Sequence, residues 1–281
     1  MSGQTNDKYR LGFIGGGKLA GSVVRGLVRA NFCLPNEILV AEPNDDVRES
    51  LGNDFGVSIT AENAEVAEEA QMIFIGVKPG VVLRVVEEIA VTTENKLVVS
   101  LAAGVGVASM EGKGSARYLR AMTNTPAAVC QAATAIARGS RTTDIDLDHV
   151  REIFLAVGTV VEVEERLIDA VTALAGSGPA FVYTVIEALA EGGRKCGLQE
   201  EVSLGLATQT VRGAAQLALE SGLSPDELRR LVITPGGTTA AGLTTMEERG
   251  SAAGISAAVE AAAARAKELA PNESERAAKD A

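Results

Sequence analysis

Several residue types are scarce in this chain, and each shortage argues against a class of site. The 281 residues include no tryptophan, one histidine and three cysteines. We expect the single histidine, His149, to lie on a solvated helix face, and with no second one neither a Ser–His nucleophile nor a His-based metal site is expected. Cys33, Cys130 and Cys196 are far apart and lack the spacing of a metal site. We therefore expect reduced structural thiols, and no bound metal.

Long apolar runs and positive charge are also lacking. The opening residues MSGQTNDKYR contain no apolar core of a signal peptide, and no apolar run reaches the roughly 18 residues of a membrane span. The formal net charge is −11, which disfavours nucleic acid and anionic membranes as partners. We expect a soluble, cytoplasmic protein that binds neither nucleic acid nor a membrane.

The first part of the chain alternates short β-branched runs with helical patterns. Such alternation predicts a parallel sheet covered by helices on both faces, a doubly wound α/β fold. The expected strands are 11–15, 37–41, 72–77, 96–101, 117–122 and 160–163, and the expected helices are 18–30, 45–53, 62–70, 81–89 and 144–157. We assign residues 1–166 to this dinucleotide-binding domain.

From about Leu167 onward the strand signal disappears. Residues 167–281 are rich in alanine, leucine and glycine and poor in aromatic residues, and helices are expected at 168–196, 200–221, 225–232, 238–249 and 253–270. A segment of this composition can hardly bury a thick core alone. We expect an all-α domain that interdigitates with a second subunit; the alternative is a solitary helical bundle.

The strongest cofactor signal is GFIGGGKLA, a G-x-G-x-x-A pattern between an expected strand and an expected helix. In this pattern Gly15 makes the tight turn, Gly17 lets a pyrophosphate approach the backbone, and Ala20 permits close helix–strand packing. Lys18 and Leu19 open the helix and belong to the same site. The context predicts dinucleotide binding.

An acidic residue ends the second expected strand, where the ribose of the adenosine half should lie. Glu42 can accept hydrogen bonds from a ribose 2′-OH and would repel a 2′-phosphate, and Pro43 follows it in the same loop. This favours NADH. The alternative is that Glu42 points into solvent, and Arg48 could still serve a phosphate, so NADH and NADPH both remain open.

Three further turns follow strand ends, where ligands bind in open α/β sheets. Small residues leave room for a nicotinamide ring in the second turn, and Asn124 and Thr125 in the third can hydrogen-bond its ribose or carboxamide. Lys78, in the turn after the expected strand 72–77, is either a catalytic acid or, as we favour, a cofactor-contacting or structural residue. The turns are Val77-Lys78-Pro79, Leu101-Ala102-Ala103-Gly104 and Met122-Thr123-Asn124-Thr125-Pro126.

In the helical half, the segment Thr234-Pro235-Gly236-Gly237-Thr238-Thr239 looks like an anion-binding turn. Two glycines allow several N–H groups to point the same way. Flanking hydroxyls can cap the helix expected at 239–248, and its N-terminus favours a small carboxylate. A second break, Ala175-Gly176-Ser177-Gly178-Pro179-Ala180, interrupts an apolar helical run. It either frees backbone groups for a ligand or is a simple kink.

Together these motifs resemble the pyrroline-5-carboxylate reductase family over roughly residues 10–270. The quoted segments are GFIGGGKLA, VKP, SLAAGV, MTNTP, DAVTALAGSGPAF and TPGGTTAAGLTTME. The resemblance implies a Rossmann-type domain, a helical dimerisation domain, an intertwined homodimer and often a ring of dimers. It also implies that hydride passes from NADPH or NADH to a cyclic imine, giving L-proline in the last step of proline biosynthesis.

The resemblance assigns roles to residues of the anion-binding turn. The substrate carboxylate would lie against the amides of Gly236, Gly237 and Thr238, with help from the Thr234 hydroxyl. Thr239 would hydrogen-bond the ring nitrogen of the imine. No strong general acid is needed, because a protonated imine is already electrophilic and positioning can supply much of the acceleration.

Three residues before this turn depart from the family pattern. Arg229 and Arg230 stand where the family usually has a lysine and an acidic residue, and Ile233 replaces a small residue. They leave open a paralogue that reduces a related cyclic imine acid, and a non-catalytic NAD(P)-binding sensor or scaffold. A β-hydroxyacid dehydrogenase would need a catalytic lysine in the helical half, and Lys195 lacks the expected surroundings.

Overall fold

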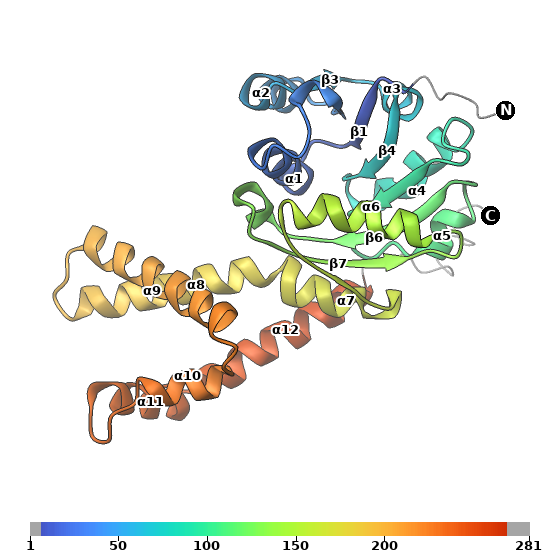
Figure 1. Cartoon of the computed structure of the whole chain (residues 1–281). Helices are drawn as coiled ribbons and strands as arrows, with labels where there is room; N and C mark the ends of the chain where they lie inside the picture. The colour runs from blue at the N-terminus through green and yellow to red at the C-terminus, as the bar shows by residue number, and fades with distance from the viewer. Residues whose placement is uncertain (1–6, 269–281) are drawn as a thin grey trace. The chain divides into compact units, whose positions relative to one another are not determined.

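The computed structural model describes residues 7–268, which divide into two units (Figure 1). We call residues 7–177 with 261–268 the sheet unit, and Gly178–Glu260 the helical unit. Residues 167–177, which the sequence assigned to the second domain, have their contacts with the sheet unit. The last two residues of the helix expected at 253–270 lie outside the described residues.

The sheet unit is built on one eight-stranded sheet of order β3-β2-β1-β4-β5-β6-β7-β8. The strands are β1 Tyr9–Ile14, β2 Ile38–Ala41, β3 Ser58–Thr60, β4 Ala70–Ile75, β5 Leu97–Ser100, β6 Arg117–Met122, β7 Ala132–Arg138 and β8 Gly158–Glu162. The order reverses between β1 and β4, which is the switch point of a doubly wound fold.

Two strands were missed by the sequence analysis, and one of them changes the sheet. The missed strands are β3 and β7, and β7 runs antiparallel to β6, with Met122 opposite Ala135. The prediction of a parallel sheet is therefore wrong at this one pairing. The segment AATAIAR has one β-branched aliphatic residue, so its strand conformation depends on pairing between β6 and β8 rather than on propensity.

Helices cover both faces of the sheet, as the alternating pattern predicted. One apolar core combines the sheet with α1, α2 and α6, and the other combines it with α3, α4 and α5. The central side chains Phe13 and Phe74 stack with their ring centroids 4.8 Å apart. The helices are α1 Lys18–Arg29, α2 Asp45–Phe55, α3 Asn63–Glu69, α4 Pro79–Ile89, α5 Val107–Glu111, α6 Asp144–Leu155 and α7 Ile168–Val171.

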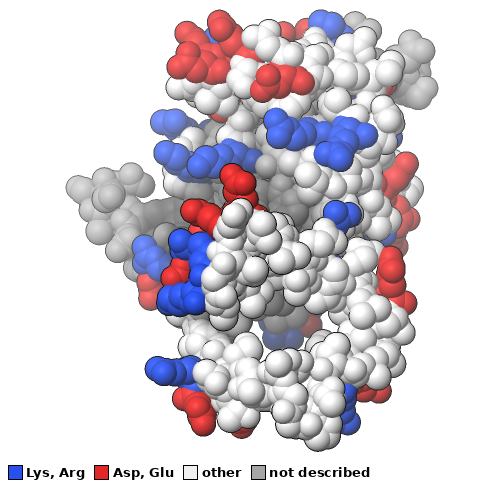
Figure 2. All heavy atoms as spheres, turned by 90° about the vertical axis from the view of Figure 1, so that its left-hand side faces the viewer, with Lys and Arg blue, Asp and Glu red and all other residues white. Residues whose placement is uncertain are grey.

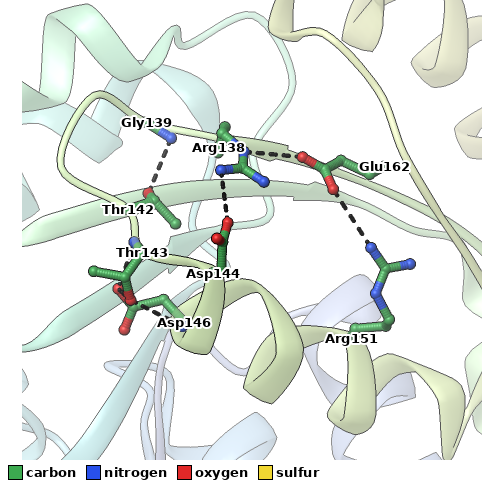
Figure 3. Close-up of polar contacts among 8 residues, drawn as sticks. All are labelled: Arg138, Gly139, Thr142, Thr143, Asp144, Asp146, Arg151 and Glu162. Atoms are coloured by element: carbon green, nitrogen blue, oxygen red, sulfur yellow. Dashed lines mark hydrogen bonds and ion pairs between the residues drawn. The ribbon is translucent and has the colours of Figure 1, made fainter.

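Hydrogen bonds and ion pairs connect β7, β8 and α6 at the edge of the sheet (Figure 3). Arg138 on β7 bridges Glu162 on β8 and Asp144 at the start of α6. At the N-terminus of α6, Thr143 and Asp146 form a capping box in which each side chain accepts from the other's backbone N–H. These contacts fix α6 against the strand pair.

The helical unit contains α8 Gly178–Lys195, α9 Glu200–Ser221, α10 Pro225–Leu231, α11 Thr238–Glu248 and most of α12 Ser251–Glu268. Helices α8 and α9 form a hairpin in which the Ser203 hydroxyl donates to the Ala190 carbonyl at 2.6 Å. Across Gly178–Glu260, all of which the structure describes, only Ala190, Ser203 and Ala207 are buried. Such a segment lacks a core of its own, as the sequence predicted.

Exposed apolar side chains are frequent on these helices. Leu206 is 57% exposed, Leu219 73% and Leu231 72%, and Figure 2 shows broad areas of one face of the molecule without charged side chains. The helical stretch Glu165–Lys195 has the length and composition of a membrane-crossing helix, with a mean hydropathy of 1.3 over its most apolar 18 residues. Helices packed in soluble proteins share that property, so the expectation of no membrane contact stays a prediction.

Candidate active site

The glycine-rich turn between β1 and α1 has the geometry that its pattern predicted. Gly15 has φ +93°, a conformation that favours glycine, and its N–H donates to the Ala41 carbonyl at 2.8 Å. Ala20 is fully buried, and a Cβ on Gly76 would lie only 2.6 Å from its methyl group. A Cβ on Gly17 would meet no described atom within 4 Å. The backbone at the start of α1 is therefore open to a ligand.

Five predicted turns lie along one edge of the sheet, at the carboxyl ends of adjacent strands. In spatial order these turns follow β2, β1, β4, β5 and β6. They share one edge because the five strands run parallel. Ligands of open α/β sheets bind at this edge. The fold therefore places the residues that the sequence assigned to the cofactor side by side.

Glu42, at the end of β2, points toward the glycine-rich turn rather than into solvent. Its Oε2 accepts from the Gly16 N–H at 2.8 Å, and its Oε1 accepts from the Asn44 N–H at 3.0 Å. Arg48 donates to the Glu42 carbonyl and pairs with Asp45, so its guanidinium is already engaged. The alternative of a solvent-pointing carboxylate is thereby excluded, and contact with a ribose stays a prediction.

Other predicted cofactor residues occupy the rim of the same edge. Lys18 begins α1 and is exposed, Leu19 is half-buried, and Pro43 is exposed beside Glu42. A hollow of about 630 Å³ borders Gly16, Gly17 and Lys18 and runs between α1 and α2. The exposed Lys78 is the N-cap residue of α4, and its carbonyl accepts from the Val81 N–H at 2.9 Å.

The turn after β5 is compact. Ala102 is buried, Ala103 is half-buried, and Gly104 has φ +71°. The Ala102 N–H donates to the Ser100 hydroxyl at 3.3 Å. These small residues lie between the ends of β4 and β6, which fits the expected space for a nicotinamide ring.

Asn124, after β6, is buried and uses its side chain within the fold. Its Oδ1 accepts from the Ala133 N–H at 3.1 Å, and its Nδ2 donates to the Ala175 carbonyl at 3.0 Å. The bond to Ala175 holds a π-helical turn, Thr172–Gly176, in which the Ser177 N–H donates to the Thr172 carbonyl. The break expected at 175–180 is thus this wider turn, followed by α8. Cofactor contact by Asn124 remains a prediction.

The anion-binding turn of the helical unit has the backbone expected for its glycines. Gly236 has φ +71°, and the Gly237 N–H donates to the Thr234 carbonyl at 2.9 Å. Helix α11 begins at Thr238, with Gly237 as its N-cap and no side-chain cap. The expected hydroxyl cap is therefore wrong. Its absence leaves the first amides of α11 without an internal acceptor, and Thr239 is half-buried one residue further on.

A second cavity, of about 460 Å³, lies at the opposite, amino edge of the sheet. Two of its cations are already paired with carboxylates, Lys96 with Asp7 at 2.9 Å and Arg117 with Asp146 at 2.8 Å, and Arg10 donates to the Phe32 carbonyl. His149 lines it from α6 and is exposed, as predicted. This cavity holds none of the residues assigned to cofactor or substrate.

Arg120 and Glu165 form an ion pair in the sheet unit that the sequence analysis missed. The signal was present, because Arg120 stands in the otherwise apolar interior of a buried strand, RYLRAM. Its partner lies 45 residues away in the sequence, and no local pattern points to it.

A doubly wound sheet with an open glycine-rich turn at its switch point is the architecture of a dinucleotide-binding protein. Comparisons with known families identify the particular family. Residues 165–269 match pyrroline-5-carboxylate reductase dimerisation domains. Residues 10–104 match the family described as NADP oxidoreductase, coenzyme F420-dependent. The chain belongs to the pyrroline-5-carboxylate reductase family.

Relatives and solved structures cover nearly the whole chain. Pyrroline-5-carboxylate reductases of Glycine max and Methanosarcina acetivorans are 41% and 40% identical, over 94% of this chain and 97% and 98% of theirs. The Coxiella burnetii reductase structure has a TM-score of 0.85 at 35% identity, covering 95% of this chain and 100% of that one. The Plasmodium falciparum reductase with NADP bound has a TM-score of 0.86 at 28% identity, covering 94% and 99%.

Proposed function

We propose that this chain reduces pyrroline-5-carboxylate to L-proline with a reduced nicotinamide dinucleotide. The observation that carries the proposal is the match of residues 165–269 to the reductase's dimerisation domain, because that segment includes the Thr234–Thr239 turn expected to bind the substrate. The row of turns at the carboxyl edge of the sheet supports it from the cofactor side.

The residues at that edge fit a dinucleotide. The open backbone at Gly17 and the first amides of α1 suit a pyrophosphate. We assign Gly15, Gly17, Lys18 and Leu19 to the pyrophosphate, Glu42 and Pro43 to the adenosine ribose, and Lys78, Ala102, Ala103, Gly104 and Asn124 to the nicotinamide half. When bound, the reduced nicotinamide supplies the hydride.

The substrate end of the site uses backbone amides and hydroxyls. We assign the carboxylate of the imine to the amides of Gly236, Gly237 and Thr238, with the Thr234 hydroxyl beside them. The missing side-chain cap at Gly237 supports this role for the Thr238 amide, which no side chain caps, whereas the Gly237 N–H already donates to the Thr234 carbonyl at 2.9 Å. Thr239 would accept a hydrogen bond from the protonated ring nitrogen and so orient the imine carbon.

NADH is the cofactor that the Glu42 geometry favours. Its carboxylate is held by two backbone N–H groups, so it cannot easily turn away from a 2′-phosphate. The Plasmodium falciparum relative was solved with NADP bound. A preference for NADH would therefore come from Glu42 at the end of β2 in this chain.

We further propose that the chain works as a homodimer, with rings of dimers as the larger assembly, in the cytoplasm. The exposed leucines of the helical unit and its lack of a buried core support pairing with a second copy. The Rossmann-type domain would then end near 166–177, where the contacts of the two units divide.

The direct test is oxidation of NADH and of NADPH by purified protein, with and without pyrroline-5-carboxylate, followed at the nicotinamide absorbance. We expect oxidation that depends on the imine and is faster with NADH. Folded protein that binds a cofactor and shows no imine-dependent oxidation would contradict the proposal.

The residues just before the anion-binding turn favour two alternative functions. One is a reductase of a six-membered cyclic imine acid, and the other is a non-catalytic sensor. Arg229 and Arg230 both pair with Asp226 on α10, just before the anion-binding turn, and Ile233 is half-buried there. Assays with five- and six-membered imine acids in parallel separate these candidates from the main one.

A further inference from the structure

Arg120 is an unusual residue for the place it occupies in β6. Its side chain is only 6% exposed, and its ion pair with Glu165, from Nη1 to Oε1, spans 3.4 Å. Neither Nε nor Nη2 has a hydrogen-bond partner among the described residues. Burial lowers the pKa of Arg120, and the carboxylates of Glu165 and Asp169 oppose that effect. An arginine held this way costs folding free energy, so stability does not explain it.

Glu165 also bonds the backbone of α5. The same Oε1 accepts from the Val107 N–H at 2.5 Å. Val107 is the first residue of α5, and its N-cap, Gly106, has no side chain to serve as a cap. Glu165 therefore supplies, from 58 residues away in the sequence, the acceptor that this turn lacks.

The segment anchored in this way runs from β5 into α5. It contains Ala102, Ala103 and Gly104, and it ends at the amide that Glu165 holds. The pyrophosphate site at Gly15–Gly17 and the ribose site at Glu42 occupy the β1–β2 side of the carboxyl edge. The other half of a dinucleotide must then extend over the ends of β4 and β5, toward this segment.

We propose that Arg120 and Glu165 are positioning residues for hydride transfer: the pair fixes the backbone of residues 102–107 against the nicotinamide half of the cofactor. This inference rests on the proposed function only for the identity of the cofactor. Neither residue touches the reacting atoms; Arg120 acts through Glu165, and Glu165 acts through the Val107 amide.

The test compares the affinity of two ligands in binding experiments that need no imine. NADH reaches the segment 102–107, whereas ADP-ribose ends before it. In Glu165→Ala we expect NADH affinity to fall by about tenfold and ADP-ribose affinity to stay within about twofold of wild type. Glu165→Gln keeps an acceptor for Val107 but no ion pair, so it should fall between the two.

The matched control is Glu164→Gln, since Glu164 is the neighbouring residue and pairs only with the exposed Arg166 among the described residues. It should bind both ligands as wild type does. Equal weakening of both ligands in Glu165→Ala would mean a general structural role and would overturn the proposal. Unchanged affinity for both would overturn it as well.

Arg120→Met gives a second, independent readout. It removes two unpartnered donors and keeps the apolar volume, so we expect a melting temperature at or above that of wild type. NADH affinity should nevertheless fall while ADP-ribose affinity holds. A variant with wild-type NADH affinity contradicts the role of Arg120; if it does not fold, the Glu165 variants decide. Imine-dependent turnover of the wild type tests the proposed function separately.

Discussion

At the scale of single residues, Glu42 has the most direct consequence for chemistry. Its carboxylate lies between the glycine-rich turn and the loop after β2, held by the amides of Gly16 and Asn44. A fixed negative charge at a ribose site disfavours a 2′-phosphate. The loss of that charge should therefore change the choice of cofactor more than the rate of catalysis.

We expect Glu42→Ser to raise the ratio of kcat/KM for NADPH over NADH by about tenfold or more, because removal of one close like charge is worth at least about 1.4 kcal/mol. Steady-state kinetics with each cofactor at saturating imine measure the ratio. An unchanged ratio would show that Glu42 does not lie beside the ribose. Glu62→Ser, at an exposed position on the loop after β3, serves as a control for lost charge alone.

Thr239 is the second residue with a direct consequence. It lies in the first turn of α11, half-buried, directly after the amides assigned to the substrate carboxylate. We expect Thr239→Ala to lower kcat/KM for the imine by about tenfold to a hundredfold, the value of one hydrogen bond to a charged group. Thr239→Ser keeps the hydroxyl and should retain most of the activity. Normal turnover in the alanine variant would remove the proposed role.

At the scale of elements, the start of α6 carries a pH-dependent contribution to stability. Burial of Asp146 opposes its ionisation, but hydrogen bonds from Arg117 and Thr143 outweigh this and hold its pKa below the usual range. The carboxylate is 6% exposed and bonds Arg117 through both oxygens. Because the folded pKa is lower than the unfolded value of about 3.9, the contribution is present above that pH and is lost as pH falls through the folded pKa.

We expect Asp146→Asn to lower the free energy of unfolding at pH 7 by about 2 kcal/mol, since it breaks charge-assisted hydrogen bonds. The difference from wild type should shrink below about pH 4, where the wild-type carboxylate is being protonated. Urea unfolding at a series of pH values measures both effects. Asp144→Asn is the control, because Asp144 is exposed and pairs with Arg138 at the surface (Figure 3). A pH-independent difference would contradict the assignment to Asp146.

Elements also show where prediction from sequence succeeds. Helix α9 was expected at 200–221 and has those bounds, and α10 and α11 differ from expectation by one residue at an end. Their ends are set locally, by Ser224 as a capping-box residue and by Gly222 in the left-handed conformation. Strand β7 was missed because its conformation depends on distant partners. The hydroxyl cap of α11 was wrong because Gly237, not a threonine, takes the N-cap position.

At the scale of the whole molecule, the helical unit needs a partner surface. It buries three residues within one chain and exposes a series of leucines on α9. Apolar area of this extent is normally covered in solution, and residues 165–269 match a dimerisation domain. A second copy of the chain is therefore the expected cover.

We expect Leu206→Asp, on α9, to shift the protein from dimer toward monomer, because a charge buried without a partner destabilises an interface. Sedimentation velocity at several protein concentrations measures the shift. Val91→Asp, at a residue of the sheet unit that is 91% exposed, is the control and should remain dimeric. If both variants keep the wild-type mass, Leu206 does not lie in the subunit interface.

The sequence by itself determined the features that depend on neighbouring residues. The alternation of strands and helices, the turn conformations of Gly15 and Gly236, and the helix ends follow from local sterics and hydrogen bonds, which act within a few residues. The motifs at these turns were sufficient for the family resemblance, and the comparisons confirmed it.

Only the tertiary structure decided the features that depend on residues brought together from a distance. Glu42 accepts from the Gly16 amide, Asn124 donates to Ala175 in the π turn, and Glu165 accepts from the Val107 amide at the start of α5 while it pairs with Arg120. In each case a buried polar group needs a partner whose place is set by packing of the sheet, and the spacing of residues along the chain carries no information about it.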